Sequence, residues 1–449
     1  MSSSSANLHV VVGLGVTGLS CARYLSQQGI ACAVTDASEH PSGLEGLRQS
    51  CPDMPVSLGK LDTQLLSQAA KIVLSPGIAL SEPVIAAQIK KGTPVVGDIE
   101  LFAQATQAPV IAVTGTNAKS TVTSLVGKMV AAAGLRTHVG GNLGVPALDL
   151  LAGSTASDVF VLELSSFQLE TTYSLTPTVA TILNITPDHM DRYHDVQAYQ
   201  QAKHKIYQHC RVAVCNRDDV RTDCDLPSLE KKFYFTLQSP RANEFGLLRV
   251  GEDFFLSYGE TPLLSVQELP VLGKHYQANA LAALALGHGF GLPWEPMLQV
   301  LREFQGLPHR CQLVRKRKQV NWYNDSKGTN VGATIAAIEG LAGAEGSKII
   351  LIAGGLGKNA DFSPLLAVIE KYVRAVVLIG EAAPLLANLI NNRVDTYFAT
   401  TMADAVDQAD QVAQAGDIVL LSPACASWDM FKHYAHRGEV FTECVDRLP

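Results

Sequence analysis

The sequence predicts an α/β protein with three domains. These are an N-terminal Rossmann-like domain (residues 1–99), a central P-loop ATPase-like sheet (100–306) and a C-terminal doubly wound dinucleotide-fold domain (307–449). Short apolar runs alternate with helical segments along the chain, which is typical of parallel sheets covered by helices. The chain of 449 residues is also several times the usual domain length, so more than one hydrophobic core is expected.

The first domain is expected to begin at residue 8, where an apolar run ends in Gly13-Leu14-Gly15-Val16-Thr17-Gly18 and passes into a helix. This G-x-G-x-x-G motif, with Asp36 about twenty residues further on, is the dinucleotide fingerprint. Its glycines let the backbone turn tightly and approach a diphosphate, a geometry that UDP-type ligands need as much as NAD does. Taken alone, the motif is a weak signal, and glycines that serve only tight strand-to-helix packing are the alternative.

The central domain carries the strongest motif, the segment from Thr114 to Thr121 (TGTNAKST), which follows an apolar run and opens a helix. Successive backbone N–H groups at such a helix start can surround an anion. Lys119 would place a positive charge on the β- and γ-phosphates, and the hydroxyl of Ser120 or Thr121 can ligate magnesium. An N-capped helix with a solvated lysine is the alternative.

Later residues of the central domain are candidate metal ligands. Glu163 ends an apolar run, and a carboxylate at a strand tip beside a phosphate loop is where a magnesium ligand belongs. His189 lies in the loop after the next apolar run, where an ordinary hydrogen-bonded histidine is the alternative. Lys203 shares a helix face with Tyr199 and Ile206. Such a lysine usually packs its aliphatic stem on the apolar face and extends its ammonium to water. The alternative is that Lys203 reacts with carbon dioxide to give a carbamate that ligates a second magnesium.

The rest of the chain is expected to contain a hairpin-like stretch at 231–265, an Ala- and Leu-rich helix at 275–292 and alternating strands and helices from 320 onward. Loops at these later strand ends hold polar residues, and the carboxyl ends of strands are where doubly wound sheets bind ligands. Each residue alone could be a helix cap or a surface charge. The candidates are Arg310, Asp325, Ser326, Lys327, Thr329, Asn330, Lys358 and Ser427.

Composition and charge favour small-molecule substrates. The formal net charge of −7 provides no cluster of positive charge for DNA or RNA. Nine cysteines are dispersed without a C-x-x-C pair, so neither a disulfide framework nor a structural metal is expected, and a cytoplasmic protein is predicted. The N-terminus MSSSSAN lacks the pattern of a signal peptide, and no apolar stretch is long enough for membrane insertion.

Ten ordered motifs resemble the Mur ligases, which build the peptide of bacterial peptidoglycan. They are VVGLGVTGLS, SPGIAL, GTNAKST, GGNLG, LELSSFQLE, NITPDHMDRY, LPHR, NDSKGTN, GGLGKNADFSPL and SPACASWDMFKHYAHRGEVF. The resemblance implies an ATP- and magnesium-dependent ligase with two magnesium sites, whose substrates are UDP-N-acetylmuramoyl-L-alanine and D-glutamate. It also implies that the L-alanyl carboxylate is activated as an acyl phosphate before the D-glutamate amine attacks it.

The resemblance assigns roles to residues in the matching motifs. The expected ATP-binding residues are Gly115, Thr116, Asn117, Ala118, Lys119, Ser120, Thr121, Asn279, Arg310 and Asp325. Ser120, Glu163, His189 and carbamylated Lys203 would bind magnesium, and Lys119, His189 and Lys327 would be catalytic. The UDP part of the substrate would contact Val16, Thr17, Asp36, Gly77 and Asn142, and D-glutamate would contact Thr329, Lys358, Ser427 and Tyr434.

Three positions depart from the family pattern. Ala118 stands where glycine usually precedes the loop lysine, which raises the question of whether that peptide tolerates a Cβ. Tyr276 stands where asparagine is common, so a ring stack is expected there, and Leu356 replaces an aspartate and is given no polar role. The alternatives are another Mur ligase, an NAD-dependent oxidoreductase or a nucleotide-binding module without catalysis. A folylpolyglutamate synthase would place the phosphate loop nearer the N-terminus.

Overall fold

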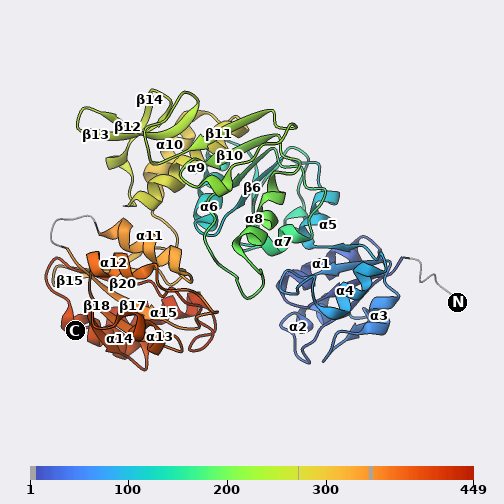
Figure 1. The fold of residues 1–449 in the computed structure, drawn as a ribbon. Helices are drawn as coiled ribbons and strands as arrows, with labels where there is room; N and C mark the ends of the chain where they lie inside the picture. The colour runs from blue at the N-terminus through green and yellow to red at the C-terminus, as the bar shows by residue number, and fades with distance from the viewer. Residues whose placement is uncertain (1–6, 272, 343–346) are drawn as a thin grey trace.

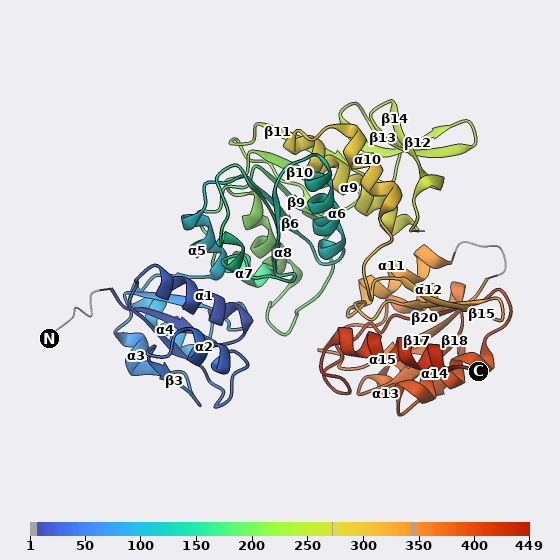
Figure 2. The ribbon, with the colours of Figure 1, turned by 180° about the vertical axis from the view of Figure 1, so that it is seen from behind.

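The computed structural model describes residues 7–271, 273–342 and 347–449, and the strands of these residues form three sheets. Each sheet and its helices make up one of three consecutive domains (Figure 1). The central domain adjoins both others, whereas the ribbons of the N-terminal and C-terminal domains lie apart in Figure 1 and in the reverse view of Figure 2. The three-domain α/β organisation predicted from the sequence is therefore confirmed.

The N-terminal domain is built on a parallel sheet of strand order β3-β2-β1-β4-β5. Its elements are β1 (His9–Val12), α1 (Val16–Gln27), β2 (Cys32–Thr35), α2 (Leu44–Ser50), β3 (Val56–Ser57), α3 (Thr63–Ser67), β4 (Lys71–Leu74), α4 (Pro83–Lys90) and β5 (Val95–Val96). The turn between β1 and α1 is tight, because a Cβ at Gly18 would lie 1.8 Å from the carbonyl oxygen of Gly13. Gly18 is thus required for close packing of strand and helix, and Gly13 has a φ of 89°, whereas a Cβ at Gly15 would meet no atom within 4 Å.

The central sheet has the strand order β14-β13-β12-β11-β10-β9-β6-β8-β7. Its strands are β6 (Val110–Thr114), β7 (Thr137–Gly141), β8 (Val159–Glu163), β9 (Val179–Ile182), β10 (Val212–Asn216), β11 (Lys231–Phe235), β12 (Glu244–Val250), β13 (Asp253–Tyr258) and β14 (Thr261–Ser265). The helices are α5 (Asp98–Ala105), α6 (Lys119–Ala132), α7 (Ser166–Glu170), α8 (Val196–His204), α9 (Lys274–Phe290) and α10 (Trp294–Glu303), with short 3-10 turns η2 (Asp149–Leu151), η3 (Lys205–Tyr207), η4 (Val220–Thr222) and η5 (Val266–Glu268).

The hairpin expected at 231–265 is only partly present. β11 pairs in parallel with both β10 and β12, and antiparallel pairing is confined to β12, β13 and β14. A strand's own residues define its two faces, but they do not specify its partner, which explains the error. The helix predicted at 275–292 is confirmed as α9, which packs with α6 on the sheet.

The C-terminal sheet has the strand order β15-β16-β20-β17-β18-β19 and is parallel except for β15 at one edge. Its strands are β15 (Gln312–Arg317), β16 (Val320–Asn324), β17 (Ile349–Gly354), β18 (Val373–Ile379), β19 (Asp395–Phe398) and β20 (Ile418–Leu421). The helices are α11 (Val331–Leu341), α12 (Leu365–Tyr372), α13 (Ala383–Ile390), α14 (Met402–Val412) and α15 (Tyr434–Arg447). Among the described residues, no helix is both long enough and apolar enough to span a bilayer.

The inner strands of all three sheets are buried on both faces. Val10–Val12 of β1, all five residues of β6 and all six residues of β17 are buried. Strands covered by helices on both faces need such continuous apolar sequence. Polar side chains therefore gather at the strand ends and in the loops that follow them. The expected boundary at residue 99/100 falls inside α5, which leads from the first domain into the second.

Candidate active site

The phosphate loop predicted at residues 114–121 joins the buried strand β6 to the helix α6. Ala118 precedes the helix in the left-handed conformation, with φ of 66°. Asn184, at the end of the neighbouring strand, supports the loop because its side-chain oxygen accepts the Asn117 N–H at 2.8 Å and its carbonyl accepts the Thr116 N–H at 2.9 Å. The first N–H groups of α6 have no intrahelical acceptor, so the loop is suited to hold an anion.

Two lysine side chains converge on the carbonyl oxygen of Gly115. Lys119 Nζ donates to it at 3.0 Å and to the Thr116 carbonyl at 2.9 Å, and Lys203 Nζ donates to the same Gly115 oxygen at 2.9 Å. Only 1% of Lys203 is exposed. Burial lowers the pKa of Lys203 well below its usual value, and the nearby Lys119 adds to this effect. Lys203 therefore has an increased fraction of neutral amine, the form that reacts with carbon dioxide.

Glu163 ends β8 beside the phosphate loop, and its carboxylate fits the requirements of a cation site. Only 3% of the residue is exposed. One side-chain oxygen accepts the Asn142 Nδ2 at 2.7 Å, whereas the other is buried without a hydrogen-bond partner. Burial alone would raise the pKa of Glu163, but Lys119 and the Asn142 hydrogen bond outweigh burial and lower it. A buried, ionised carboxylate with one free oxygen is suited to ligate magnesium.

His189 lies in the loop after β9 in the left-handed conformation, with φ of 59°. Its ring packs edge-on against Phe167, with ring centroids 4.8 Å apart, and also against Tyr199 at 6.3 Å. Burial lowers the pKa of His189, although the adjacent Asp188 opposes the change. The ring is thus held in place and favours the neutral form that can ligate a metal.

Arg310, in the segment between the central and C-terminal domains, reaches the first turn of α6. Its Nη2 donates to the Ser120 hydroxyl at 2.7 Å. A further link between the two domains joins the side chains of Asn117 and Asn330, at 3.1 Å from Asn330 Nδ2 to the Asn117 oxygen. The C-terminal domain therefore contributes positive charge and hydrogen bonds to the phosphate loop.

A cavity of about 310 Å³ lies between the central and C-terminal domains beside this loop. Asp325 lines it and is held by the Ser422 hydroxyl at 2.7 Å and the Cys311 N–H at 3.2 Å. Burial raises the pKa of Asp325 to about 6. The predicted ATP-binding residues that line the cavity are Asn117, Ala118, Thr121, Asn279, Arg310 and Asp325. Tyr276 also lines it and stacks on Phe304 with an interplanar angle of 8°.

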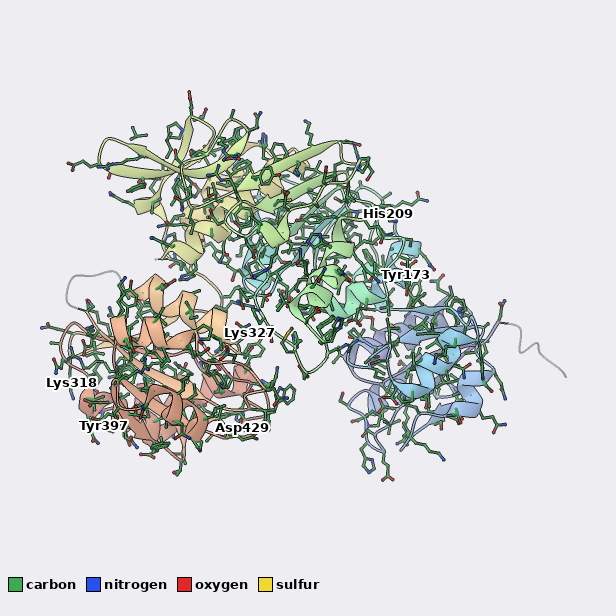
Figure 3. The ribbon with its side chains drawn as sticks, viewed as in Figure 1. Tyr173, His209, Lys318, Lys327, Tyr397 and Asp429 are labelled. Atoms are coloured by element: carbon green, nitrogen blue, oxygen red, sulfur yellow. The ribbon has the colours of Figure 1, made fainter. Side chains whose placement is uncertain are left out.

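A larger cavity of about 780 Å³ is lined by residues of all three domains. Lys327 lies at its C-terminal-domain side, where this domain approaches the central one (Figure 3), with Nζ 3.8 Å from the Tyr434 ring centroid. Burial lowers the pKa of Lys327 to about 8, and Arg310 and Lys119 add to the effect. The predicted site residues in this lining are Val16, Thr116, Asn117, Ala118, Lys119, Asn142, Glu163, His189, Lys203, Arg310, Lys327, Thr329, Lys358, Ser427 and Tyr434.

The other predicted residues lie outside the linings of both cavities. Ser120 is 5% exposed and is bound by Arg310, and Gly115 faces the two lysines with its carbonyl. Thr17, Asp36 and Gly77 lie at the carboxyl edge of the N-terminal sheet, where β1, β2 and β4 end side by side. The Asp36 carboxylate there accepts the Leu14 N–H at 2.6 Å and the Ser38 N–H at 2.7 Å.

Sequence reasoning missed three residues that organise the site: Asn184, Phe167 and Arg192. Asn184 could have been noticed, because it is a polar residue just beyond a buried strand. Phe167 and Arg192 lie within the quoted motifs LELSSFQLE and NITPDHMDRY, but these motifs do not show which residues the two side chains contact, since Arg192 reaches both Phe167 and Pro76 elsewhere in the chain. Within the described residues, no three His, Cys, Asp or Glu side chains are grouped as a metal cluster. A second metal site built on His189 would therefore need a further ligand, such as a carbamate on Lys203.

Three family models match consecutive parts of the chain: "Mur ligase MurD-like, N-terminal domain" at residues 7–97, "Mur ligase middle domain" at 113–287 and "Mur ligase, glutamate ligase domain" at 309–425. The UDP-N-acetylmuramoylalanine--D-glutamate ligase of Pseudomonas putida is 50% identical over 446 residues, which cover 99% of this chain and 98% of the relative. The ligase of the same name from Coxiella burnetii (strain CbuK_Q154) is 49% identical over 445 residues, covering 99% of this chain and 100% of the relative.

Solved structures with the same fold are more distant in sequence. The UDP-N-acetylmuramate-alanine ligase MurC of Thermotoga maritima has a TM-score of 0.60 at 18% identity, covering 97% of this chain and 98% of its own. MurF of Acinetobacter baumannii has a TM-score of 0.61 at 17% identity, covering 95% of this chain and 88% of its own. At these identities the likeness extends to the fold alone.

Proposed function

The chain belongs to the Mur ligase family, and we propose that it joins D-glutamate to UDP-N-acetylmuramoyl-L-alanine with hydrolysis of ATP to ADP and phosphate. The observation that carries this proposal is the one cavity that brings Lys119, Glu163 and Lys358 together from two domains with Val16 from the third. The product belongs to peptidoglycan precursor synthesis, and we place the reaction in the bacterial cytoplasm.

ATP is proposed to bind along the phosphate loop, with its adenosine part in the cavity of about 310 Å³. Asn279 and Asp325 line that cavity, and Tyr276 presents a ring instead of the asparagine common in the family. The γ-phosphate end would then face Lys119 and the larger cavity. On nucleotide binding, the Lys119 ammonium would exchange its two carbonyl acceptors for phosphate oxygens, which are stronger acceptors.

Two magnesium sites are proposed, one where the phosphate loop adjoins the larger cavity and one within that cavity. Ser120 and Glu163 would supply ligands for one, and the free, buried oxygen of Glu163 supports this assignment. His189 and a carbamate on Lys203 would supply ligands for the other. Bound magnesium neutralises phosphate charge during phosphoryl transfer.

The carbamate is proposed to form when the neutral Lys203 amine attacks carbon dioxide and loses a proton. This reaction converts a cation into an anionic oxygen ligand. The depressed pKa and the buried position of Lys203 support it. A buried cation at Lys203, which shares the Gly115 carbonyl with Lys119, is otherwise unfavourable, because desolvation and the like charge both oppose it.

The chemistry proceeds in two steps. The L-alanyl carboxylate attacks the γ-phosphorus, which breaks the bond to ADP and leaves an acyl phosphate. The neutral amine of D-glutamate then attacks the acyl carbon, and the resulting tetrahedral intermediate loses a proton from nitrogen and expels phosphate, which can carry that proton away, to leave an amide. Because a carboxylate is a poor electrophile, the first step is chemically necessary. Lys119 and Lys327 would stabilise negative charge that develops on the transferring phosphoryl group and the leaving phosphate.

The substrates are proposed to enter from opposite domains. The UDP part would contact Val16, Thr17, Asp36 and Gly77 at the edge of the N-terminal sheet, and Asn142 of the central domain. D-Glutamate would contact Thr329, Lys358, Ser427 and Tyr434, all of which line the larger cavity. Lys358 is a suitable partner for a side-chain carboxylate. An NAD-dependent reaction has no support beyond the glycine fingerprint, because three Mur ligase models cover most of the chain.

A direct assay tests the proposal. Purified protein with ATP, magnesium and UDP-N-acetylmuramoyl-L-alanine is offered single amino acids, and released phosphate is measured. D-Glutamate is expected to give turnover, whereas L-glutamate, L-alanine and diaminopimelate give background rates. Lys119→Ala should abolish turnover, and Lys128→Ala, an exposed lysine on the same helix, should not. Phosphate release that is independent of the amino acid would refute the proposal.

A further inference from the structure

Arg192 makes an unusual set of contacts outside the two cavities. Its Nη1 donates to the Pro76 carbonyl at 2.8 Å, and its Nη2 donates to the Ile78 carbonyl at 3.3 Å and to Glu170 at 2.6 Å. The guanidinium carbon also lies 4.1 Å from the centroid of the Phe167 ring. The side chain is 13% exposed, so these contacts are largely shielded from water.

These contacts connect two domains. Pro76 and Ile78 belong to the loop after β4 in the N-terminal domain, and they flank Gly77, which is proposed to contact the UDP part of the substrate. Arg192 itself belongs to the central domain, in the loop after β9. The guanidinium therefore holds the two carbonyls on either side of a proposed substrate contact.

The same residue is linked to His189 in two ways. Its backbone N–H donates to the His189 carbonyl at 2.9 Å, which helps to hold that residue in its left-handed conformation. Its guanidinium packs on Phe167, whose ring also contacts the His189 ring at 4.8 Å. A continuous series of contacts thus runs from the loop around Gly77 through Arg192 and Phe167 to His189.

We propose that Arg192 is a positioning residue that couples the loop around Gly77 to His189, so that binding of the UDP substrate orders the phosphate-transfer end of the site. This inference rests on the proposed function. Arginine suits the role because its planar fork can donate to two carbonyls and a carboxylate at once, whereas the ammonium of lysine is a compact charge. The Glu170 carboxylate, from the central domain, accepts from the same Nη2 that donates to the Ile78 carbonyl, and so helps to fix the orientation of the guanidinium.

The test compares Arg192→Gln and Arg192→Lys with Arg211→Gln, a control arginine paired with Glu230 on the surface of the same domain. The dissociation constant for UDP-N-acetylmuramoyl-L-alanine is measured by calorimetry without ATP, and kcat and the KM for D-glutamate are measured by phosphate release. Arg192→Gln is expected to raise the dissociation constant about tenfold or more, the usual effect of losing charged hydrogen bonds. The KM for D-glutamate should change less than twofold, and Arg192→Lys should give an intermediate dissociation constant.

Phe167→Leu separates the two halves of the coupling. It removes the ring between Arg192 and His189 but leaves the bonds to Pro76 and Ile78. It is expected to lower kcat about tenfold while the dissociation constant of the UDP substrate stays within twofold of wild type. The inference is wrong if Arg192→Gln leaves both kcat and the dissociation constant unchanged. It is also wrong if the control Arg211→Gln changes kcat and the dissociation constant as much as Arg192→Gln does.

Folding and activity controls make each result decisive. Circular dichroism and thermal melting establish that a variant is folded, and a purely structural role would lower the active fraction without changing the dissociation constant. If Arg192→Gln does not fold, Arg192→Lys, which keeps the charge opposite Glu170, decides the question by its dissociation constant. A wild-type enzyme that binds the UDP substrate but shows no turnover with D-glutamate would refute the proposed function, whereas normal wild-type turnover with unchanged Arg192 variants would refute only the coupling.

Discussion

Replacement of Ala118 by glycine is expected to stabilise the central domain. Ala118 has φ of 66° at the junction of the phosphate loop and α6, and this backbone region brings the Cβ of an L-residue too close to its own carbonyl oxygen. Glycine has no such contact. Most alanine-to-glycine changes destabilise a protein, so an increase in stability here would be diagnostic of the backbone conformation.

The size of the effect follows from two opposing terms. A non-glycine residue in the left-handed region costs about 1–2 kcal/mol. Glycine makes the unfolded chain more flexible, which favours unfolding by about 0.4–1 kcal/mol. The net gain is therefore about 1 kcal/mol, somewhat reduced because the Ala118 methyl is half-buried. For a domain of this size, about 1 kcal/mol raises Tm by roughly 2–4 °C.

Differential scanning calorimetry is the suitable assay, because a three-domain chain need not unfold in a single step and the transition of each domain can be resolved. Ala131→Gly is the matched control. Ala131 is exposed near the end of the same helix with ordinary helical geometry, and glycine there should lower stability by up to about 0.5–1 kcal/mol. The two substitutions should shift Tm in opposite directions. If Ala118→Gly lowers Tm as Ala131→Gly does, the inferred strain at Ala118 is wrong.

Three other predictions concern catalysis. Lys203→Ala should reduce phosphate release to near background, and added formate or acetate should restore part of it by replacing the carbamate; full turnover of the unsupplemented variant would contradict this. Since the pKa of Lys327 is lowered to about 8, its positive charge is lost as pH rises through that value, so wild-type kcat/KM should fall above about pH 8. Lys327→Arg should lessen this decline if it retains activity, and an identical pH profile would argue against a role for the charge. Saturating ATP analogue and UDP substrate should lower the radius of gyration in small-angle scattering, because residues proposed to hold the ligands lie on separate domains; an unchanged radius would refute closure.

Local patterns were sufficient to predict the fold class and the strand, loop and helix start around residues 114–121. An inner parallel strand needs a continuous apolar run, and the residues proposed to bind phosphate follow it within a single segment of eight residues, 114–121. The same reasoning failed at β11, because side-chain periodicity does not specify which neighbour a strand pairs with. The sequence also raised the question of whether the peptide at Ala118 tolerates a Cβ, but it could not answer it, since the backbone angle there depends on the surrounding loop.

The amino-acid sequence by itself determined which residues begin and end the apolar strands, and hence which polar groups lie at their carboxyl ends. Only the tertiary structure decided which of those groups meet. Lys203 reaches the Gly115 carbonyl across 88 positions, Arg192 reaches Pro76 across 116, and Arg310 reaches Ser120 across 190. Such contacts depend on how the sheets and domains pack, and burial then sets the charge state of each group. Neither the partner nor the local environment of these side chains is encoded in the residues next to them.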